Sequence, residues 1–232
     1  MPPRVRAAAP VVIGLIPLFS LAGAGPAHAG DSSEPLQLGA ARVTTGKALL
    51  GKLTVRAEHR GGYQRSKFKH WIDVDNDCQD TRSEVLQRES QVKVAFYSAR
   101  QCAVLTGRWT SSYDGLVVTQ ADQLEVDHVV ALSEAWKSGG STWKKARRTR
   151  YANDLGFAWT LEPVTRKSNQ DKVDQDPAEW LPAQGRCAYA RHWVAIKYRW
   201  RLSIDTAEKR ALSGLLSGDC GLLKLKVPAR AQ

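Results

Sequence analysis

Four cysteines limit the fold of this chain more than any other feature of its sequence. Their number is even, no two of them form a CxxC pair, and no histidine lies at ligand spacing, so disulfides are favoured over a zinc site. Three pairings are open, and the sequence favours the two local ones, each closing a loop of about 25 to 35 residues and contributing about 3 kcal/mol in the chain-entropy model. These pairs are Cys78 with Cys102 and Cys187 with Cys220.

The N-terminus indicates how the chain would reach an oxidising compartment. Arg4 and Arg6 precede an apolar run, and Ala27-His28-Ala29 supplies the small residues that a signal peptidase recognises. The apolar run contains glycine and proline and is short for a membrane span of about 20 residues. We therefore predict a secretory signal over residues 1–29 and a secreted, extracellular protein without membrane contact after cleavage.

The mature chain would hold about 200 residues, enough for one domain with its own hydrophobic core. We expect residues 30–42 to be a flexible segment and residues 43–232 to form a single domain. Loss of two arginines with the signal lowers the formal net charge from +11 to about +9. This charge favours a polyanionic partner, such as nucleic acid, an acidic wall polymer or anionic lipid, although it also aids solubility.

Turn and capping signals place several helices and strands along the chain. Residues 103–110 and 115–120 alternate as strands on either side of a Ser-Tyr-Asp-Gly turn, which predicts an antiparallel hairpin. Thr81 and Glu84 form a capping-box pattern at the start of a helix over 81–90. Further helical patterns cover residues 141–155, 187–203 and 205–218, the last with Asp205 and Glu208 as a second capping box.

The centre of the chain carries two predicted strands with polar residues of the kinds that bind metal ions and transfer protons. "LEVDHVVAL" alternates as a strand and carries Asp127-His128, "AWTLEPVT" predicts a second strand, and Asn169 precedes a helix start with Asp176 as its N-cap. Asp127 and Asn169 offer two oxygen ligands for a hard ion such as Mg²⁺. His128, on the opposite side of the strand, is placed to act as a general base on a water molecule.

At these residues the chain resembles a known family. "VDHVVAL", "YANDL", "LEPVTRKSNQDK" and "DPAEWLP" look like the signature of secreted bacterial HNH endonucleases, relatives of the nuclease domain of some modification-dependent restriction enzymes. The resemblance implies an α+β fold with a ββα-metal core over about residues 122–182, flanking helices and a short antiparallel hairpin. Together with the two disulfides, this is the expected architecture.

The same resemblance assigns roles to individual residues. It implies that His128 is the general base and that Asp127 and Asn169 hold one divalent metal ion, Mg²⁺ first, with Mn²⁺ or a similar ion as the alternative. Asn153 matches the middle Asn that orients the histidine, and Lys172 falls where a basic residue can hold the phosphate. Two departures are visible: about 16 residues separate Asn153 from Asn169, and Asn instead of His at the last position argues against zinc.

Simpler interpretations of these residues stay open. Asp127-His128 suits a polar pair at a strand end, Asn169 and Asn153 suit helix caps, and Lys172 suits a surface charge. The acidic run "DVDNDC" resembles a calcium loop but lacks the glycine and the closing glutamate, so a polar turn is favoured. The roles of three residues after this run are left open: Asp80, Arg82 and Glu84.

Basic residues near the motif are expected to contact a phosphate backbone. They are Lys144, Lys145, Arg147, Arg148, Arg166 and Lys167. The sequence thus predicts a secreted metal-dependent endonuclease that hydrolyses DNA, with RNA as a further candidate substrate, with little sequence specificity and no protein partner. The alternatives are a non-catalytic exported protein that binds nucleic acid or an acidic wall polymer, and a hydrolase of another polymer.

Overall fold

The computed structural model of this chain describes residues 42–232. The predicted signal, residues 1–29, lies outside the described residues, and so does almost all of the predicted flexible segment. Within residues 42–232, no helix has the length and apolar character needed to cross a membrane. The predicted domain boundaries stay a prediction.

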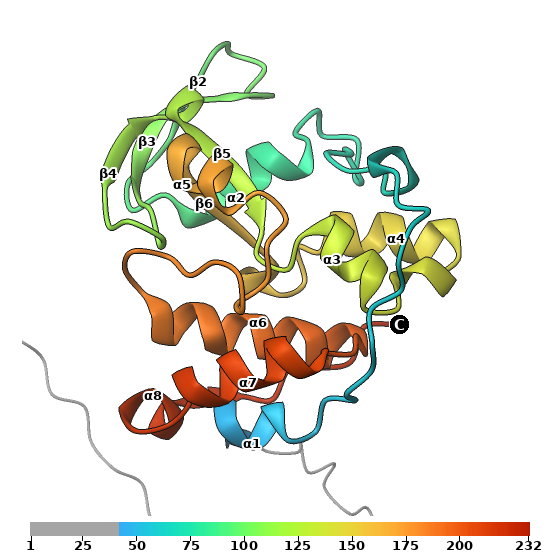
Figure 1. Ribbon diagram of the computed structural model, residues 1–232. Helices are drawn as coiled ribbons and strands as arrows, with labels where there is room; N and C mark the ends of the chain where they lie inside the picture. Colours follow the sequence, from blue (N-terminus) through green and yellow to red (C-terminus); the bar gives the residue numbers. More distant parts are fainter. Residues whose placement is uncertain (1–41) are drawn as a thin grey trace, which may run out of the picture. The chain divides into compact units, whose positions relative to one another are not determined.

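Two strands and one helix form the centre of the fold. Strands β5 (Leu124–His128) and β6 (Leu161–Thr165) pair antiparallel, with His128 opposite Leu161. Helix α5 (Arg166–Lys172) follows β6 directly because the Thr165 side chain accepts a hydrogen bond from the Ser168 amide and caps the first turn (Figure 1). The predicted order of strand, insertion, strand and helix is therefore confirmed, as is the α+β class.

The helix that follows β6 begins earlier in the chain than the sequence suggested. The expected N-cap, Asp176, follows α5 and closes only a turn, in which Asp176 Oδ1 accepts a hydrogen bond from the Ala178 amide at 2.6 Å. Thr165 takes the capping role instead, so Asn169 lies inside a helix instead of ahead of one. As a result Asn169 is held by a regular backbone beside β5.

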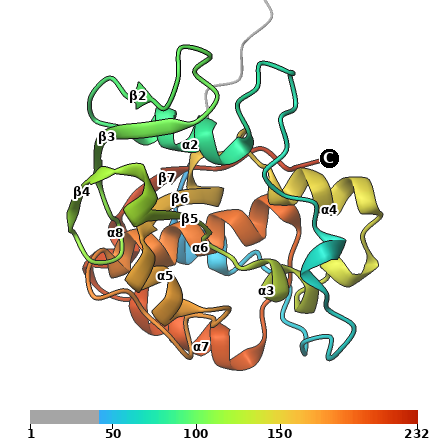
Figure 2. The same ribbon diagram turned by 90° about the horizontal axis from the view of Figure 1, so that it is seen from above.

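The insertion between β5 and β6 carries the basic helix. It contains α3 (Leu132–Lys137), the short 3-10 helix η3 (Gly140–Thr142), α4 (Lys145–Ala152) and the 3-10 helix η4 (Ala158–Thr160). Helix α4 and the hairpin of β3 (Val104–Thr110) and β4 (Val117–Gln120) lie on opposite sides of β5 and β6 in both views (Figures 1 and 2). The long insertion thus returns the chain to β5 from the side away from the hairpin.

The predicted hairpin is confirmed, and a short strand extends it. Strand β3 pairs antiparallel with β4 and with β2 (Ala95–Phe96). Its turn is fastened to α5 because Asp114 accepts hydrogen bonds from the Thr165 and Ser168 hydroxyls. The 3-10 helix η2 (Ala121–Gln123) leads from β4 into β5.

Helix α2 (Thr81–Glu89) packs against the same sheets, and its cap differs from the prediction. Asp80 Oδ1, not Thr81, accepts the hydrogen bond from the Ser83 amide, at 2.8 Å. Thr81 is the first helical residue and is fully buried, where its hydroxyl donates to Asn153. A carboxylate is an equally good cap, and this choice frees the threonine for a contact inside the protein.

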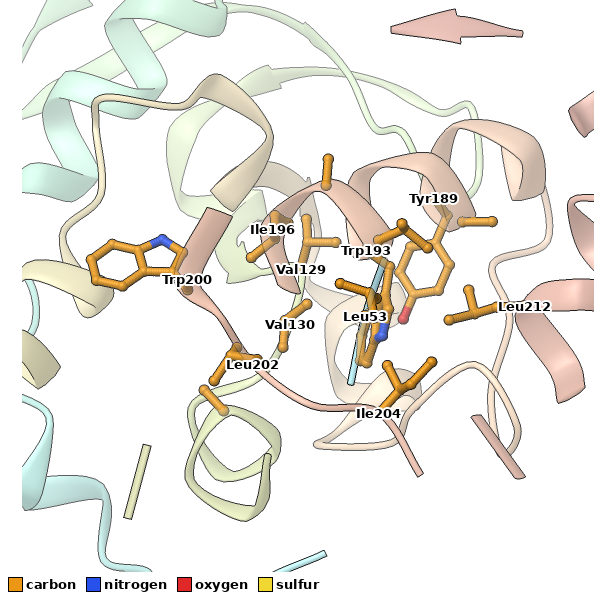
Figure 3. Close-up of a cluster of buried hydrophobic side chains, with 14 of the residues drawn as sticks. Leu53, Val129, Val130, Tyr189, Trp193, Ile196, Trp200, Leu202, Ile204 and Leu212 are labelled. Atoms are coloured by element: carbon orange, nitrogen blue, oxygen red, sulfur yellow. The ribbon is translucent and has the colours of Figure 1, made fainter. Parts of the chain in front are cut away.

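The largest hydrophobic core surrounds helix α6 (Arg186–Trp200). Its inner face is buried and includes Trp193, Ile196 and Trp200. Figure 3 shows them grouped with Val129 and Val130, which directly follow β5. Helices α1 (Gly46–Leu50) and α7 (Thr206–Leu215) complete this layer. The core therefore fixes the end of the strand that carries Asp127 and His128.

Both predicted disulfides are confirmed. Cys78 bonds Cys102, with 5.0 Å between their Cα atoms, and ties the loop before α2 to the loop before β3. Cys187 bonds Cys220, with 5.1 Å between their Cα atoms, and ties the start of α6 to α8 (Asp219–Leu222). The remaining elements are the 3-10 helix η1 (Arg65–Lys67), β1 (Val43–Thr45) and its antiparallel partner β7 (Lys224–Lys226).

Candidate active site

A cavity of about 390 Å³ brings together three of the residues that the sequence singled out. Asp127 and His128 line it from β5, and Asn169 lines it from α5. The lining also includes Tyr63 and Arg65, which are far from the motif in sequence, and Asp174, which lies in the turn after α5. The cavity therefore joins the central strand pair to the segment around η1.

Asp127 is buried and held by two donors. The Tyr113 hydroxyl donates to its Oδ2 at 2.6 Å, and the Lys172 ammonium lies 3.0 Å from Oδ2 and 3.2 Å from Oδ1. Burial raises the pKa of the Asp127 carboxyl, while Lys172 and Tyr113 act in the opposite direction. Nothing in the hairpin-turn pattern around Tyr113 marked it as a partner of Asp127.

Lys172 has a different position from the one expected. It was predicted to hold a phosphate, but its side chain has no exposed surface. Its ammonium donates to Asp127 and to the backbone carbonyl of His128 at 3.2 Å. A group with these two partners and no access to solvent cannot receive a phosphate, so we correct this expectation: Lys172 orients and neutralises Asp127.

The His128 ring is fixed by one hydrogen bond and two aromatic neighbours. Its Nε2 lies 2.9 Å from the Ala152 carbonyl oxygen, which can only accept, so the contact assigns the proton to Nε2 and leaves Nδ1 as the acceptor of the neutral ring. Trp71 stacks on the ring at 5.4 Å between centroids and Tyr151 at 6.3 Å. Burial lowers the pKa of His128 to about 3, so the ring is uncharged at neutral pH.

Asn153 lies next to Ala152, but its amide faces other groups. Its Oδ1 accepts hydrogen bonds from the Ile72 amide at 3.2 Å and the Thr81 hydroxyl at 2.9 Å. Its Nδ2 donates to the carbonyls of Lys69 and Thr149, each at 2.8 Å. The contact that orients His128 thus comes from the preceding carbonyl, while Asn153 holds the segment that carries Trp71.

Asn169 presents one free oxygen. Its Nδ2 donates to Glu125 Oε2 at 2.6 Å, which fixes the amide and leaves Oδ1 without a hydrogen-bond donor among residues 42–232. Together with Asp127, this gives a donor set made only of oxygen atoms. Such a set would suit a hard divalent ion that keeps several waters, because these two residues would supply few protein ligands and the Asp127 carboxylate is also bonded to Lys172.

The predicted nucleic-acid contacts separate into two groups. Four are exposed: Lys144, Lys145, Arg166 and Lys167. Arg147 and Arg148 are half-buried and bonded within the protein, to the carbonyls of Trp200 at 3.2 Å and of Lys67 at 3.1 Å. Their aromatic neighbours explain this, since the Arg147 guanidinium lies 5.0 Å from the centre of the Trp143 ring. These two arginines pack α4 against the rest of the fold.

Of the three residues whose roles were open, Asp80 and Arg82 have structural partners. Asp80 caps α2. The Arg82 guanidinium donates to the carbonyls of Ala121 at 2.9 Å and Leu124 at 3.3 Å, which fastens α2 to the start of β5. Burial and the negative charges of the Asp73–Asp77 turn raise the pKa of Glu84. In that turn the Asp73 carboxylate accepts from the backbone amides of Asn76 and Cys78, as the polar-turn interpretation requires.

Comparison with known proteins supports a nuclease relationship. Residues 80–215 match the family of the C-terminal domain of GmrSD restriction endonucleases. The chain is also 42% identical over 179 residues to an "uncharacterized secreted protein" of Arthroderma benhamiae, an alignment that covers 75% of this chain and 85% of the relative. That relative is fungal, so the bacterial origin expected from the resemblance is not confirmed. No solved structure matches the chain.

Proposed function

The chain belongs to the family of the C-terminal domain of GmrSD restriction endonucleases, and from this we propose that it is a secreted, metal-dependent endonuclease that hydrolyses phosphodiester bonds of DNA. The observation that carries the proposal is the cavity in which a neutral, oriented His128 lies beside the oxygen donors of Asp127 and Asn169. The secreted relative and the two disulfides support an extracellular location. RNA is a second candidate substrate.

His128 acts as the general base in this proposal. The Ala152 carbonyl holds the proton on Nε2, so Nδ1 accepts a proton from the attacking water. Trp71 and Tyr151 restrict the ring to one plane, which keeps Nδ1 directed without a conformational search. Burial lowers the pKa of His128 to about 3, so the ring is unprotonated and able to accept a proton at neutral pH.

Asp127 and Asn169 would hold the divalent cation, with Mg²⁺ as the expected ion and Mn²⁺ as the alternative. When bound, the cation supplies positive charge that stabilises the developing negative charge on the phosphate and on the leaving oxygen. Tyr113 and Lys172 hold the Asp127 carboxylate in one orientation. Glu125 does the same for the Asn169 amide.

Arg65 is our candidate for the phosphate contact in place of Lys172. It is exposed, and it lines the same cavity as His128. Its guanidinium lies 3.4 Å from the ring of His70, and a planar guanidinium suits bidentate recognition of a phosphate. The exposed Lys144, Lys145, Arg166 and Lys167 would add contacts along the backbone that carry no sequence information.

A plasmid-nicking assay with Mg²⁺, and again with EDTA, tests the proposal. Asp127→Asn preserves the shape of the buried residue, and Asn169→Ala removes the free oxygen; both should raise the Mg²⁺ concentration needed for half-maximal cleavage. Glu179→Gln, an exposed carboxylate outside the cavity, is the matched control. Intact plasmid with every divalent ion tried, together with retained DNA binding, would instead establish the non-catalytic binding protein.

A further inference from the structure

A second group of carboxylates lies apart from the cavity described above. Single oxygen atoms of Glu58, Asp176 and Asp205 all lie within 4.8 Å of one another. Asp176 is buried and the Glu58 side chain is 27% exposed. Three anionic groups at this separation repel one another strongly unless a positive charge lies between them.

Two of these three carboxylates already accept a hydrogen bond from the backbone. Asp205 Oδ1 caps α7 by accepting from the Glu208 amide at 2.8 Å, and Asp176 Oδ1 accepts from the Ala178 amide at 2.6 Å. Among residues 42–232, the second oxygen of each has no hydrogen-bond donor. These carboxylates are therefore held in place and still have an oxygen each for another ligand.

Glu134 provides a separate observation that points to a ligand. Its side chain is 1% exposed, and its buried Oε2 has no hydrogen-bond partner within residues 42–232, although Oε1 is bonded to Lys197 at 2.7 Å. Glu134 lies one turn before Lys137 on α3, and this turn faces the Glu58 segment: the Lys137 carbonyl accepts from the His59 amide at 2.9 Å, and the Lys137 ammonium lies 4.0 Å from Glu58. Burial, and after it the negative charge of Glu134, raises the pKa of Glu58. A buried carboxylate oxygen with no donor is costly, so something positive is missing at this point.

Among residues 42–232, two lysines form ion pairs with carboxylates of this region. Lys197 is fully buried and is shared between Glu134 and Glu208, each at 2.7 Å. Lys137 lies 4.0 Å from Glu58. Two ammonium groups thus face five carboxylates: Glu58, Glu134, Asp176, Asp205 and Glu208. The excess is negative and lies in one place.

We propose that Glu58, Asp176, Asp205 and Glu134 Oε2 form a structural binding site for a divalent cation, with Ca²⁺ as the ion. The donors are all carboxylate oxygens, and they come from four separate segments of the chain, which suits the flexible coordination of Ca²⁺ better than the strict octahedron of Mg²⁺. Outside cells, sites of this class bind Ca²⁺ with dissociation constants of about 0.1 to 1 mM.

The site would also support the proposed active-site cavity. The cavity is lined by Tyr63, Arg65 and Asp174. Glu58 lies shortly before the first two in sequence, and Asp176 lies two residues after Asp174. A cation between Glu58 and Asp176 would hold the two lining segments together. The inference itself rests on the carboxylate geometry and does not depend on the proposed nuclease activity.

Thermal unfolding of the full mature protein, first in EDTA and then with added CaCl₂, tests the proposal. At 10 mM CaCl₂ we expect Tm to rise by about 3 to 10 °C above a KCl control of equal ionic strength, with half of that rise reached at about 1 to 2 mM. Glu58→Gln should remove most of this rise and, in EDTA, should unfold at a higher temperature than the unchanged protein, because a repulsion is gone. Asp176→Asn should behave in the same way.

Two controls separate this site from others. Asp75 lies in the exposed Asp73–Asp77 cluster, the other group of carboxylates with suitable spacing among residues 42–232. The Asp75→Asn variant should keep the full rise in Tm with Ca²⁺. Asn169→Ala should keep it too, because Asn169 belongs to the active-site cavity. A Tm that Ca²⁺ does not raise above the KCl control would overturn the proposal and leave a shared proton between Glu58 and Glu134. A rise that survives both Glu58→Gln and Asp176→Asn, or that Asp75→Asn abolishes, would overturn it as well.

Discussion

Replacing Tyr113 by phenylalanine tests whether a network inside the protein holds Asp127. The change removes only the hydroxyl that donates to Asp127 Oδ2 at 2.6 Å and leaves the fully buried ring in place. A hydrogen bond to a charged group contributes about 1.5 to 3 kcal/mol to stability. The loss should therefore lower the free energy of unfolding by about 2 kcal/mol, with no cavity to add to it.

Tyr189→Phe is the matched control for this substitution. Tyr189 is also buried, and its ring packs against Tyr113 with 5.6 Å between centroids, but no residue in the described part of the chain forms a hydrogen bond with its hydroxyl. Removing an unsatisfied buried hydroxyl should leave stability unchanged or increase it. The two variants lose the same atom from the same kind of residue, so the difference between them reports on the Asp127 contact.

Urea denaturation measures the difference. With a slope of about 2 kcal/mol per molar urea, Tyr113→Phe should lower the unfolding midpoint by about 1 M at an unchanged slope. The same variant should require more Mg²⁺ for half-maximal cleavage, because Asp127 loses one of the groups that orient it. Equal midpoints for the two variants, or a larger loss in Tyr189→Phe, would refute the role given to Tyr113.

Three further predictions concern Asn153, His128 and the disulfide between Cys78 and Cys102. Asn153→Ala removes four hydrogen bonds and should lower stability by about 3 kcal/mol in the same urea experiment, whereas a change within about 0.5 kcal/mol would contradict the contacts given for its amide. The rate of cleavage at saturating Mg²⁺ should not fall between pH 7.5 and 5.5 through protonation of His128, because its pKa is lowered to about 3. A tenfold fall in rate over this range would contradict this, since it is the fall that a histidine base with the ordinary pKa of about 6.5 would give. Replacing Cys78 and Cys102 together by serine should cost about 3 kcal/mol, measured by thermal unfolding, and an unchanged Tm would contradict a structural role for that disulfide.

Much of the site follows from local sequence patterns. The alternation around Asp127-His128, the second strand and the short distance to Asn169 predict a strand pair followed by a helix, and the structure has this order. The cysteine spacing predicts both disulfides for a similar reason, since each closes a short loop. Features that depend on a few neighbouring residues are the ones that the sequence defines well.

Contacts between distant segments could not be predicted in this way. Ala152 orients His128 through a backbone carbonyl, which any residue type would supply, so its side chain carries no signal. Lys172 was expected to face a phosphate because helix position alone does not say which way a side chain is directed, and burial against Asp127 decides it. Glu208 fits a capping box, yet its carboxylate is bonded to the buried Lys197 of α6 instead.

The rate of DNA cleavage by His128→Ala, measured under single-turnover conditions at saturating Mg²⁺, tests the proposed mechanism most directly. His59→Ala is the control, since His59 is exposed and lies outside the cavity. A positioned general base contributes about 10²- to 10⁴-fold, so His128→Ala should lose at least about 100-fold in rate while binding DNA as the unchanged protein does, and His59→Ala should cleave normally. A His128→Ala protein that cleaves within a few fold of the unchanged rate would contradict the assignment of His128 as the base.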